Sequence, residues 1–348
     1  MKYLLYTDVH WNTFSSIIRS IGEKYSIRLE NLIKSVNWAE NLAIEQNCDG
    51  IICLGDFFDK PDLTSQQITA LNEIKWANME HEFIVGNHDA SNKDLSFNSV
   101  NVLSRVGQVV SGFKKQKIDT NTYFLYLPYI QDDVRLSIKE YRKILDIPEN
   151  AKVIVLSHND VKGIQYGPII TKEGIELDDI ENNCSLFLNG HIHNGSQFCK
   201  NGFNLGDLTG KTFEEDGFKY SHQVILLEIV NNDITIDFIE NPFAFNFYQL
   251  EIKDTNDLLK LKNLKDNAIV SIKYLPSIKA ELEALIENSK NITESKLNRI
   301  IELADVESDK LLVTLNDMDY LEQFKTFTIA QLGDSEAVLN EIQRIIMA

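Results

Sequence analysis

Five short apolar runs in this chain each end in a cluster of Asp, His and Asn residues. The runs cover residues 3–7, 50–54, 82–85, 152–156 and 186–188, and they lead into DVH, GDFFD, GNHD, SHND and NGHIH. Apolar residues at helical spacing predict a helix over 29–46, between the first two runs, and a second helix over 65–78. Strands that alternate with helices predict an α/β sandwich whose polar motifs lie on loops at strand ends.

The side chains of these motifs are suited to binding metal ions. They are Asp8, His10, Asp56, Asn87, His88, His158, His191 and His193. Their oxygen and nitrogen atoms suit Mn²⁺, Fe or Zn²⁺. Two sites can form if one carboxylate bridges them, and we predict that Asp56 is that bridge. Two ions about 3.5–4 Å apart can hold both the attacking and the leaving oxygen of a phosphoryl displacement.

Each motif taken alone also has an ordinary structural explanation. GDFFD is typical of a turn followed by a helix cap, because Asp favours both positions. GNHD is compatible with a tight turn, DVH is common, and the paired histidines of GHIH can face solvent. The order of five motifs, each after an apolar run, favours the dimetal site. Outside the motifs we expect His81 on the surface, His222 in a structural role, and Lys114–Lys117 in a solvated loop.

Composition limits the class of protein. A length of 348 residues predicts about two domains. The net charge of −18 argues against strong DNA binding by this chain alone, because phosphate binding normally needs a basic face. No apolar run approaches the ~20 residues of a membrane helix, and the N-terminus lacks the apolar core of a signal peptide. The four cysteines form no CxxC pair, so we expect a reduced cytoplasmic protein without membrane contact.

The pattern of the chain changes after residue 218. Two strand-like runs on either side of Asn231 and Asn232 predict a β-hairpin. The segments that follow predict a small β-α-β-α domain with helices from about 256 and over 277–289. We place domain boundaries at 1–243, 244–308 and 309–348, the last being an acidic, mostly helical tail with apolar residues such as Leu321, Phe324 and Phe327.

The motif order D-x-H, G-D-x-x-D, G-N-H-D, H and G-H-x-H resembles that of the calcineurin-like metallophosphoesterase superfamily. Within it, FLYLPYIQDDVR (124–135), LSHNDVKG (156–163) and NLGDLTGKTFEEDGFKYSHQVILLEI (204–229) resemble the SbcD family, the nuclease subunits of double-strand-break repair complexes. The compact size resembles phage-encoded members. The resemblance covers nearly the whole chain, strongly to about residue 229 and weakly beyond it.

The resemblance implies a fold, an activity and partners. The fold would be a four-layer αββα sandwich followed by an α+β DNA-capping domain and a helical tail. The activity would be 3′–5′ exonuclease and single-strand endonuclease cleavage of DNA in double-strand-break repair and recombination, with two divalent metal ions, Mn²⁺ above all. The tail would dock on an SbcC-type SMC-like ATPase, the nuclease domain would form a homodimer, and a phage-encoded protein would act in the bacterial cytoplasm.

The resemblance also implies roles for individual residues. One ion would be held by Asp8, His10, Asp56 and His193, and the other by Asp56, Asn87, His158 and His191. His88 would meet the phosphate and protonate the leaving 3′ oxygen, and Asp59 would orient His88. Two departures stand out: Trp11-Asn12 replaces the usual Leu-Gly, and Gly206-Asp207-Leu208 replaces Gly-Ser-Pro, which would add an acid near the DNA path.

Two other functions remain open at this stage. The same dimetal site would serve a phosphodiesterase or phosphatase acting on a small molecule or a protein, which the acidic charge favours and the additional C-terminal domain disfavours. A non-enzymatic scaffold that only recruits an ATPase would be expected to have a broken set of metal ligands, whereas every ligand type is present here.

Overall fold

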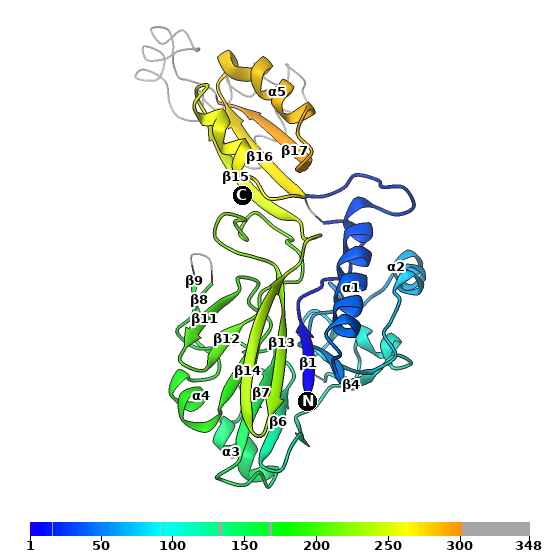
Figure 1. Ribbon diagram of the computed structural model, residues 1–348, viewed down its shortest axis with the longest axis vertical. Coiled ribbons are helices and arrows are strands. Elements are labelled where there is room, and N and C mark those ends of the chain that lie inside the picture. The colour runs from blue at the N-terminus through cyan, green and yellow to red at the C-terminus, as the bar shows by residue number, and fades with distance from the viewer. Residues whose placement is uncertain (16, 93, 132–133, 167–168, 301–348) are drawn as a thin grey trace, which may run out of the picture.

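The computed structural model describes residues 1–15, 17–92, 94–131, 134–166 and 169–300 of the chain (Figure 1). The predicted partner-binding segment 309–348 therefore lies outside the described residues. No helix in the described part is long and apolar enough to span a membrane.

The first large sheet contains the N-terminal strands and the predicted hairpin. Its order is β14 (Asp233–Glu240), β13 (Gln223–Val230), β1 (Lys2–Tyr6), β2 (Gly50–Cys53), β3 (Glu80–Ile84) and β4 (Gln108–Val110). The strands β1 to β4 are parallel, whereas β13 is antiparallel to both β1 and β14. The hairpin prediction is confirmed: Asn231 and Asn232 take positive φ angles of 52° and 68°, as a tight β-hairpin turn requires.

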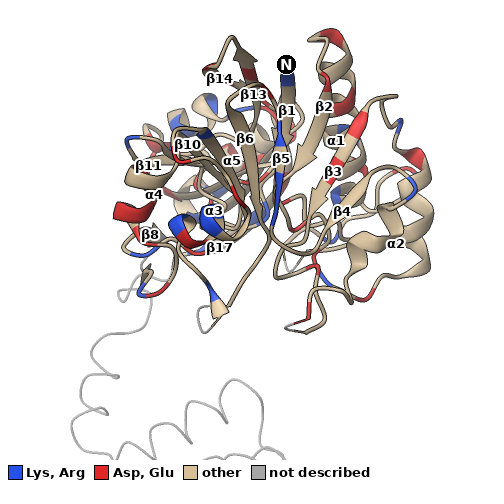
Figure 2. Cartoon of the chain, turned by 90° about the horizontal axis from the view of Figure 1, so that it is seen from below, with Lys and Arg blue, Asp and Glu red and all other residues tan. Residues whose placement is uncertain are grey.

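The second large sheet is also mixed. Its order is β11 (Ser196–Cys199), β12 (Gly202–Asn204), β10 (Leu186–Asn189), β7 (Lys152–Ser157), β6 (Thr122–Leu127) and β5 (Lys114–Lys117). The prediction of a loop over Lys114–Lys117 is wrong, because this segment pairs antiparallel with β6. Lysines are common on edge strands, where their charge discourages pairing with another chain. The strand β5 is the edge of this sheet, and it is drawn in blue in Figure 2.

Three apolar cores define four layers. The core between the sheets includes Leu5, Ile52 and Phe124. The outer face of the first sheet packs under α1 (Ile27–Glu45) and α2 (Ser65–Ala70), and the outer face of the second packs under α3 (Ile138–Ile144) and α4 (Leu177–Asn183). The molecule is thus an α/β sandwich in which two mixed sheets are enclosed by helices.

The second predicted helix is shorter than expected. It begins as predicted at Ser65, where Thr64 and Gln67 form a capping box. It ends at Ala70 and passes through the 3₁₀ helix η1 (Leu71–Glu73) instead of continuing to residue 78. The side chain of Asn37 on α1 donates to the carbonyl of Glu73 (3.1 Å) and accepts from the amide of Lys75 (2.7 Å). These tertiary hydrogen bonds hold the chain in a non-helical path.

Residues 246–299 form a third, smaller unit at one end of the molecule (Figure 1). Its parallel sheet contains β15 (Asn246–Ile252), β16 (Ala268–Tyr274) and β17 (Ile292–Arg299). The helices of this unit are η4 (Asp257–Asn263), η5 (Pro276–Ile278) and α5 (Lys279–Glu287). The sheet and the helices enclose a separate apolar core. The structure differs from the predicted β-α-β-α pattern in two respects. The first helix is 3₁₀, and the polar edge strand β17 follows α5.

Two expectations about polar residues are corrected by burial. His81 is not on the surface; it is buried under α1, where its Nε2 lies 2.9 Å from Oε2 of Glu40. Asp207 does not add an acid near a DNA path, because it is fully buried and accepts a 2.7 Å hydrogen bond from Nδ1 of His222. His222 is buried in that pair, as predicted for a structural residue.

Candidate metal centre

The polar motifs meet because parallel strands present their carboxyl ends at the same edge of a sheet. Asp8 and His10 follow β1, Asp56 follows β2, Asn87 and His88 follow β3, His158 follows β7, and His191 and His193 follow β10. The first three strands belong to one sheet and the last two to the other. Side chains from both sheets therefore converge at one end of the sandwich, as the sequence predicted.

Several of these residues have an unusual backbone conformation. Asp8, His10, Asp56 and His191 have φ angles of 50°, 47°, 48° and 72°. This left-handed region costs a non-glycine residue about 1–2 kcal/mol. Main-chain hydrogen bonds hold it, since the amides of Asp8 and His10 donate to the carbonyls of Gly55 (3.1 Å) and Asp56 (3.0 Å). Such strain is typical of functional loops.

Glycines allow the loops to approach one another closely. A Cβ atom on Gly190 would lie 2.2 Å from Oγ1 of Thr7 and 2.7 Å from Nδ1 of His158, and a Cβ on Gly86 would lie 2.1 Å from Oδ1 of Asp56. Only glycine fits at these contacts, so GNHD and NGHIH require their glycines for close approach.

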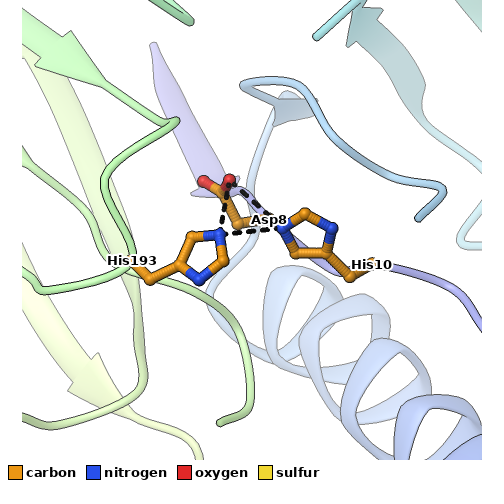
Figure 3. Close-up of side chains that lie close together, drawn as sticks. All are labelled: Asp8, His10 and His193. Carbon is orange, nitrogen blue, oxygen red and sulfur yellow. Dashed lines mark hydrogen bonds and ion pairs between the residues drawn. The ribbon is translucent and has the colours of Figure 1, made fainter. Parts of the chain in front are cut away.

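Three ligand atoms converge in a first cluster, shown in Figure 3. The Nε2 atoms of His10 and His193 are 2.9 Å apart, and each lies 3.7 Å from Oδ1 of Asp8. The other carboxylate oxygen of Asp8 accepts from Oγ1 of Thr7 (2.7 Å) and from the amide of His191 (3.0 Å). Oδ1 is buried and has no hydrogen-bond partner among the described residues, so it is available to bind an ion.

Carboxylates orient both imidazoles of this cluster. Nδ1 of His193 donates to Oε1 of Glu215 at 2.9 Å, and Nδ1 of His10 lies 3.3 Å from Oδ1 of Asp59. With Nδ1 of each ring turned to a carboxylate, Nε2 is the atom left for an ion. In the metal-free protein one proton between the two Nε2 atoms forms the 2.9 Å hydrogen bond. Carboxylate–histidine pairs of this kind are typical of metal ligands.

A second cluster forms around His158 and Asp56. Nδ1 of His158 donates to the carbonyl of Leu54 (2.7 Å), which leaves Nε2 facing Oδ2 of Asp56 at 3.1 Å. With Nδ1 committed to Leu54, Nε2 is the atom of His158 that would bind an ion, and Asp56 is its partner in the metal-free protein.

His191 and Asn87 complete the second cluster. Nε2 of His191 donates to Oδ1 of Asp160 at 3.1 Å, so Nδ1 carries a lone pair. That atom lies 2.9 Å from Oδ1 of Asn87, and two acceptors at this distance suit neighbouring ligands of one cation. The structure thus brings together all seven predicted ligands.

Asp56 is the residue common to both groups of ligands. It clusters with His10 and His88 on one side and with His158 and His191 on the other. Its Oδ1 accepts from the amide of His88 at 2.8 Å. This is the position that a bridging carboxylate would take.

The electrostatics of the centre favour cations. Burial alone would raise the pKa of Asp56, but the adjacent His158 lowers it to about 2. Burial would lower the pKa of His158, yet the carboxylates of Asp56 and Asp8 raise it to about 9. Protons are held on imidazole where metal ions would otherwise balance the acids. The oxygen and nitrogen donors, the convergence of the ligand atoms and this charge balance all fit two divalent ions, without selecting among Mn²⁺, Fe and Zn²⁺.

His88 and Asp59 lie beside the clusters. The side chain of His88 contacts the main chain of Asp59 and not its carboxylate. Nδ1 of His88 donates to the main-chain carbonyl of Asp59 at 3.1 Å. The Asp59 carboxylate instead forms an ion pair with Lys211 and accepts from Nδ2 of Asn12 at 2.8 Å. Asn12 is one half of the Trp11-Asn12 departure noted above. Burial keeps the pKa of His88 below its ordinary value.

Three residues of the centre were not predicted from the sequence: Glu215, Asp160 and Lys211. Asp160 had a local signal, since it lies two residues after His158 in SHND. Glu215 and Lys211 lie in the loop over 205–222, after β12. Nothing in the local sequence pairs that loop with His193 or Asp59; only the fold does.

Comparisons with known proteins agree with this geometry. Residues 1–195 match the model of the calcineurin-like phosphoesterase family. The DNA double-strand break repair protein Mre11 of Sulfurisphaera tokodaii is 27% identical over 180 residues, which are 49% of this chain and 45% of that protein. Mre11 of Archaeoglobus fulgidus is 20% identical over an alignment of 379 positions that includes 98% of this chain and 82% of that protein.

A solved structure is also similar to this chain. The crystal structure of a dimetal phosphatase from Danio rerio is 12% identical, with a TM-score of 0.47, over 69% of this chain and 96% of that one.

Proposed function

The chain belongs to the calcineurin-like phosphoesterase family, and on that premise we propose that it is a dimetal-dependent DNA nuclease. It would act as a 3′–5′ exonuclease and single-strand endonuclease, and as the catalytic subunit of an SbcC/SbcD-like complex in double-strand-break repair and recombination. The observation that carries this proposal is the alignment with archaeal Mre11 over 98% of the chain. That alignment extends beyond the phosphoesterase match, which ends at residue 195.

Two metal ions would be held by the two clusters. Asp8, His10, Asp56 and His193 would bind one, and Asp56, Asn87, His158 and His191 the other. When bound, such ions supply Lewis acidity and a water of lowered pKa for attack on a phosphodiester. We assign Mn²⁺ to both sites by family resemblance.

His88 would act on the substrate and not on the metals. Its Nδ1 proton is committed to the carbonyl of Asp59, so Nε2 is the atom available to the substrate. A phosphodiester brings negative charge, which favours the protonated ring. His88 would then transfer the Nε2 proton to the leaving 3′ oxygen. Asp59 would position the ring through its main-chain carbonyl, while its carboxylate orients His10.

DNA and an ATPase are the partners that we propose. The unit built on β15, β16 and β17 would cap the DNA as the 244–308 domain, the segment 309–348 would dock on an SbcC-type ATPase, and the nuclease domain would pair with a second copy. A net charge of −18 disfavours DNA binding by the chain alone. A partner with a basic surface would supply that affinity.

The same charge favours a second candidate function. An acidic phosphodiesterase or phosphatase acting on a small molecule or a protein would use the same centre without needing to attract DNA. The substrate decides between the two, and we expect Mn²⁺-dependent cleavage of DNA strands with little turnover of a cyclic dinucleotide.

Substitution of His88 tests both the function and the mechanism. We expect His88→Ala to retain the bound metals, measured by elemental analysis, and to lose nuclease activity by roughly 10²–10⁴-fold. His81→Ala is the matched control, because His81 lies outside the centre, although a folding check must accompany it. Loss of metal together with activity would make His88 a ligand, and turnover of the cyclic dinucleotide without DNA cleavage would refute the nuclease proposal.

A further inference from the structure

A pocket of about 920 Å³ opens beside the second ligand cluster. The loops that follow β3, β4 and β6 line it, together with Tyr141 of α3. This volume is at the upper end of the range for small-molecule sites in proteins.

The pocket shares a wall with the metal centre. Asn87, whose Oδ1 lies 2.9 Å from Nδ1 of His191, is one of its lining residues. Tyr129, another lining residue, has its ring centroid 5.8 Å from that of His191. The amide of Tyr129 donates to the carbonyl of Val85 at 3.1 Å, which fixes this loop against the end of β3. A group attached to a phosphate on the second cluster would therefore lie at the entrance of the pocket.

The lining suits a flat, uncharged ligand. Aromatic and apolar side chains such as Phe113, Tyr129 and Val134 are mixed with neutral polar ones such as Ser111 and Gln131. Among the lining residues that the structure describes, Asp94 is the one charged side chain, and there is no lysine or arginine. A phosphate backbone needs cations, so this surface is unsuited to it.

Two apolar side chains of the pocket face solvent. Phe113 is 41% exposed and Val134 is 66% exposed. The ring of Phe113 is held by the buried Tyr141, with 5.0 Å between centroids. A rigid, half-exposed aromatic ring is the kind of platform on which unpaired bases stack in single-strand-binding proteins.

We infer that this pocket receives an unpaired nucleobase from the nucleotide next to the scissile phosphodiester. The inference rests on the proposed function and specifies its substrate as a strand whose base has left the duplex stack. One sugar joins a base to its phosphate, so a phosphate on the second cluster brings the base to Asn87 and Tyr129. Base stacking would then supply affinity that the acidic surface does not.

The test measures how much the base adds to binding. Deoxyadenosine 5′-monophosphate and deoxyribose 5-phosphate share the sugar and phosphate and differ by the base. Calorimetry on the full chain with Mn²⁺ should give a Kd for the nucleotide about 5- to 150-fold lower, the range expected for stacking of one base. Phe113→Ala should reduce this ratio severalfold. Gly112→Leu should reduce it as well, because Gly112 lines the pocket and a Cβ there meets no atom within 4 Å.

Phe238→Ala is the matched control. Phe238 is 42% exposed, close to the value for Phe113, and it lies on β14, outside the pocket lining. Its substitution should leave the ratio unchanged. A ratio near one in the wild type, or a ratio unaffected by Phe113→Ala and Gly112→Leu, would overturn the inference. A change in oligomeric state on Phe113→Ala, without a change in the ratio, would also overturn it, since the surface would then bind a second copy of the chain.

Cleavage of a deoxythymidine oligonucleotide separates this inference from the proposed function. Cleavage of this oligonucleotide together with a Kd ratio near one in the binding assay defeats the pocket and leaves the nuclease in place. A base preference in the binding assay without cleavage of DNA defeats the nuclease and leaves the pocket as a nucleotide site.

Discussion

Replacing Glu215 tests whether a residue outside the ligand set controls the metal centre. Glu215 is 2% exposed, and its Oε1 accepts the Nδ1 proton of His193 at 2.9 Å. Burial alone would raise the pKa of Glu215, but the hydrogen bond from His193 lowers it to about 2. Glu215 is therefore an anion that fixes the His193 tautomer and directs Nε2 toward Asp8. Without it, the ring can rotate and protonate at either nitrogen.

The expected size of the effect follows from that single hydrogen bond. Loss of a carboxylate behind a metal-binding histidine typically weakens metal affinity by about 10–100-fold, or about 1.4–2.7 kcal/mol. Glu215→Ala should fall at the upper end, because the orienting acceptor and the charge are both lost. Glu215→Gln keeps an acceptor oxygen and removes only the charge, so it should fall at the lower end.

Calorimetric titration of the metal-free full chain with Mn²⁺ measures the affinity of each metal site directly. The first site should weaken, because it contains His193, while the second site around His158 should keep its affinity. Glu214→Ala is the matched control, since Glu214 is the exposed neighbour of Glu215. Glu215 also accepts from the amide of Thr212 at 3.0 Å, so thermal unfolding of the metal-free variants must be recorded. A lower melting temperature with unchanged Mn²⁺ affinity would refute the reasoning and leave Glu215 as a loop anchor.

Two further predictions concern the bridging acid and the C-terminal segment. Asp56→Asn should lower metal stoichiometry at both sites, and more than Asp8→Asn does, because two dications would face each other without a shared anion; equal losses by elemental analysis would remove the bridging role. Truncation after Ser308 should leave folding and cleavage of short oligonucleotides intact and abolish binding to the ATPase partner, with Leu321, Phe324 and Phe327 as the lost anchors; an unfolded product, or one that keeps its partner, would make the segment structural.

The convergence of the proposed ligands was predictable because each one is tied to a strand. Asp8, Asp56 and His158 directly follow or lie close behind buried apolar runs, and parallel strands must deliver such residues to a common edge. The hairpin at Asn231–Asn232 was predictable for a similar reason, since asparagine tolerates the positive φ that the turn needs. In both cases a local pattern determines the local geometry, and strand pairing in the sheet then positions the segment.

Tertiary pairing explains the predictions that were wrong or missing. His81 comes just before the apolar run 82–85 and was expected on the surface, but the strand β3 begins earlier and is covered by α1, and Glu40 on that helix supplies a buried partner. Glu215 lies in a loop without periodicity, and only the fold brings it to His193. The strand β17 is mostly polar because it forms an edge, so it gave no alternating apolar signal.

Two ion-paired lysines affect how this acidic chain would bind DNA. Near the centre, Lys211 is paired with Asp59 and Lys162 with Glu176. Each lysine already has a carboxylate partner, and the net charge of −18 already counts both lysines, so neither adds a free positive charge near the centre. If the chain acts on DNA as proposed, the affinity for DNA has three sources. They are metal ions that bind one phosphate, the pocket beside Asn87 that binds one base, and a basic surface on the ATPase partner. The first two act only within one or two nucleotides of the cut and carry no long-range attraction. The rate of encounter with DNA should therefore depend on the partner, while the choice of bond should depend on this chain.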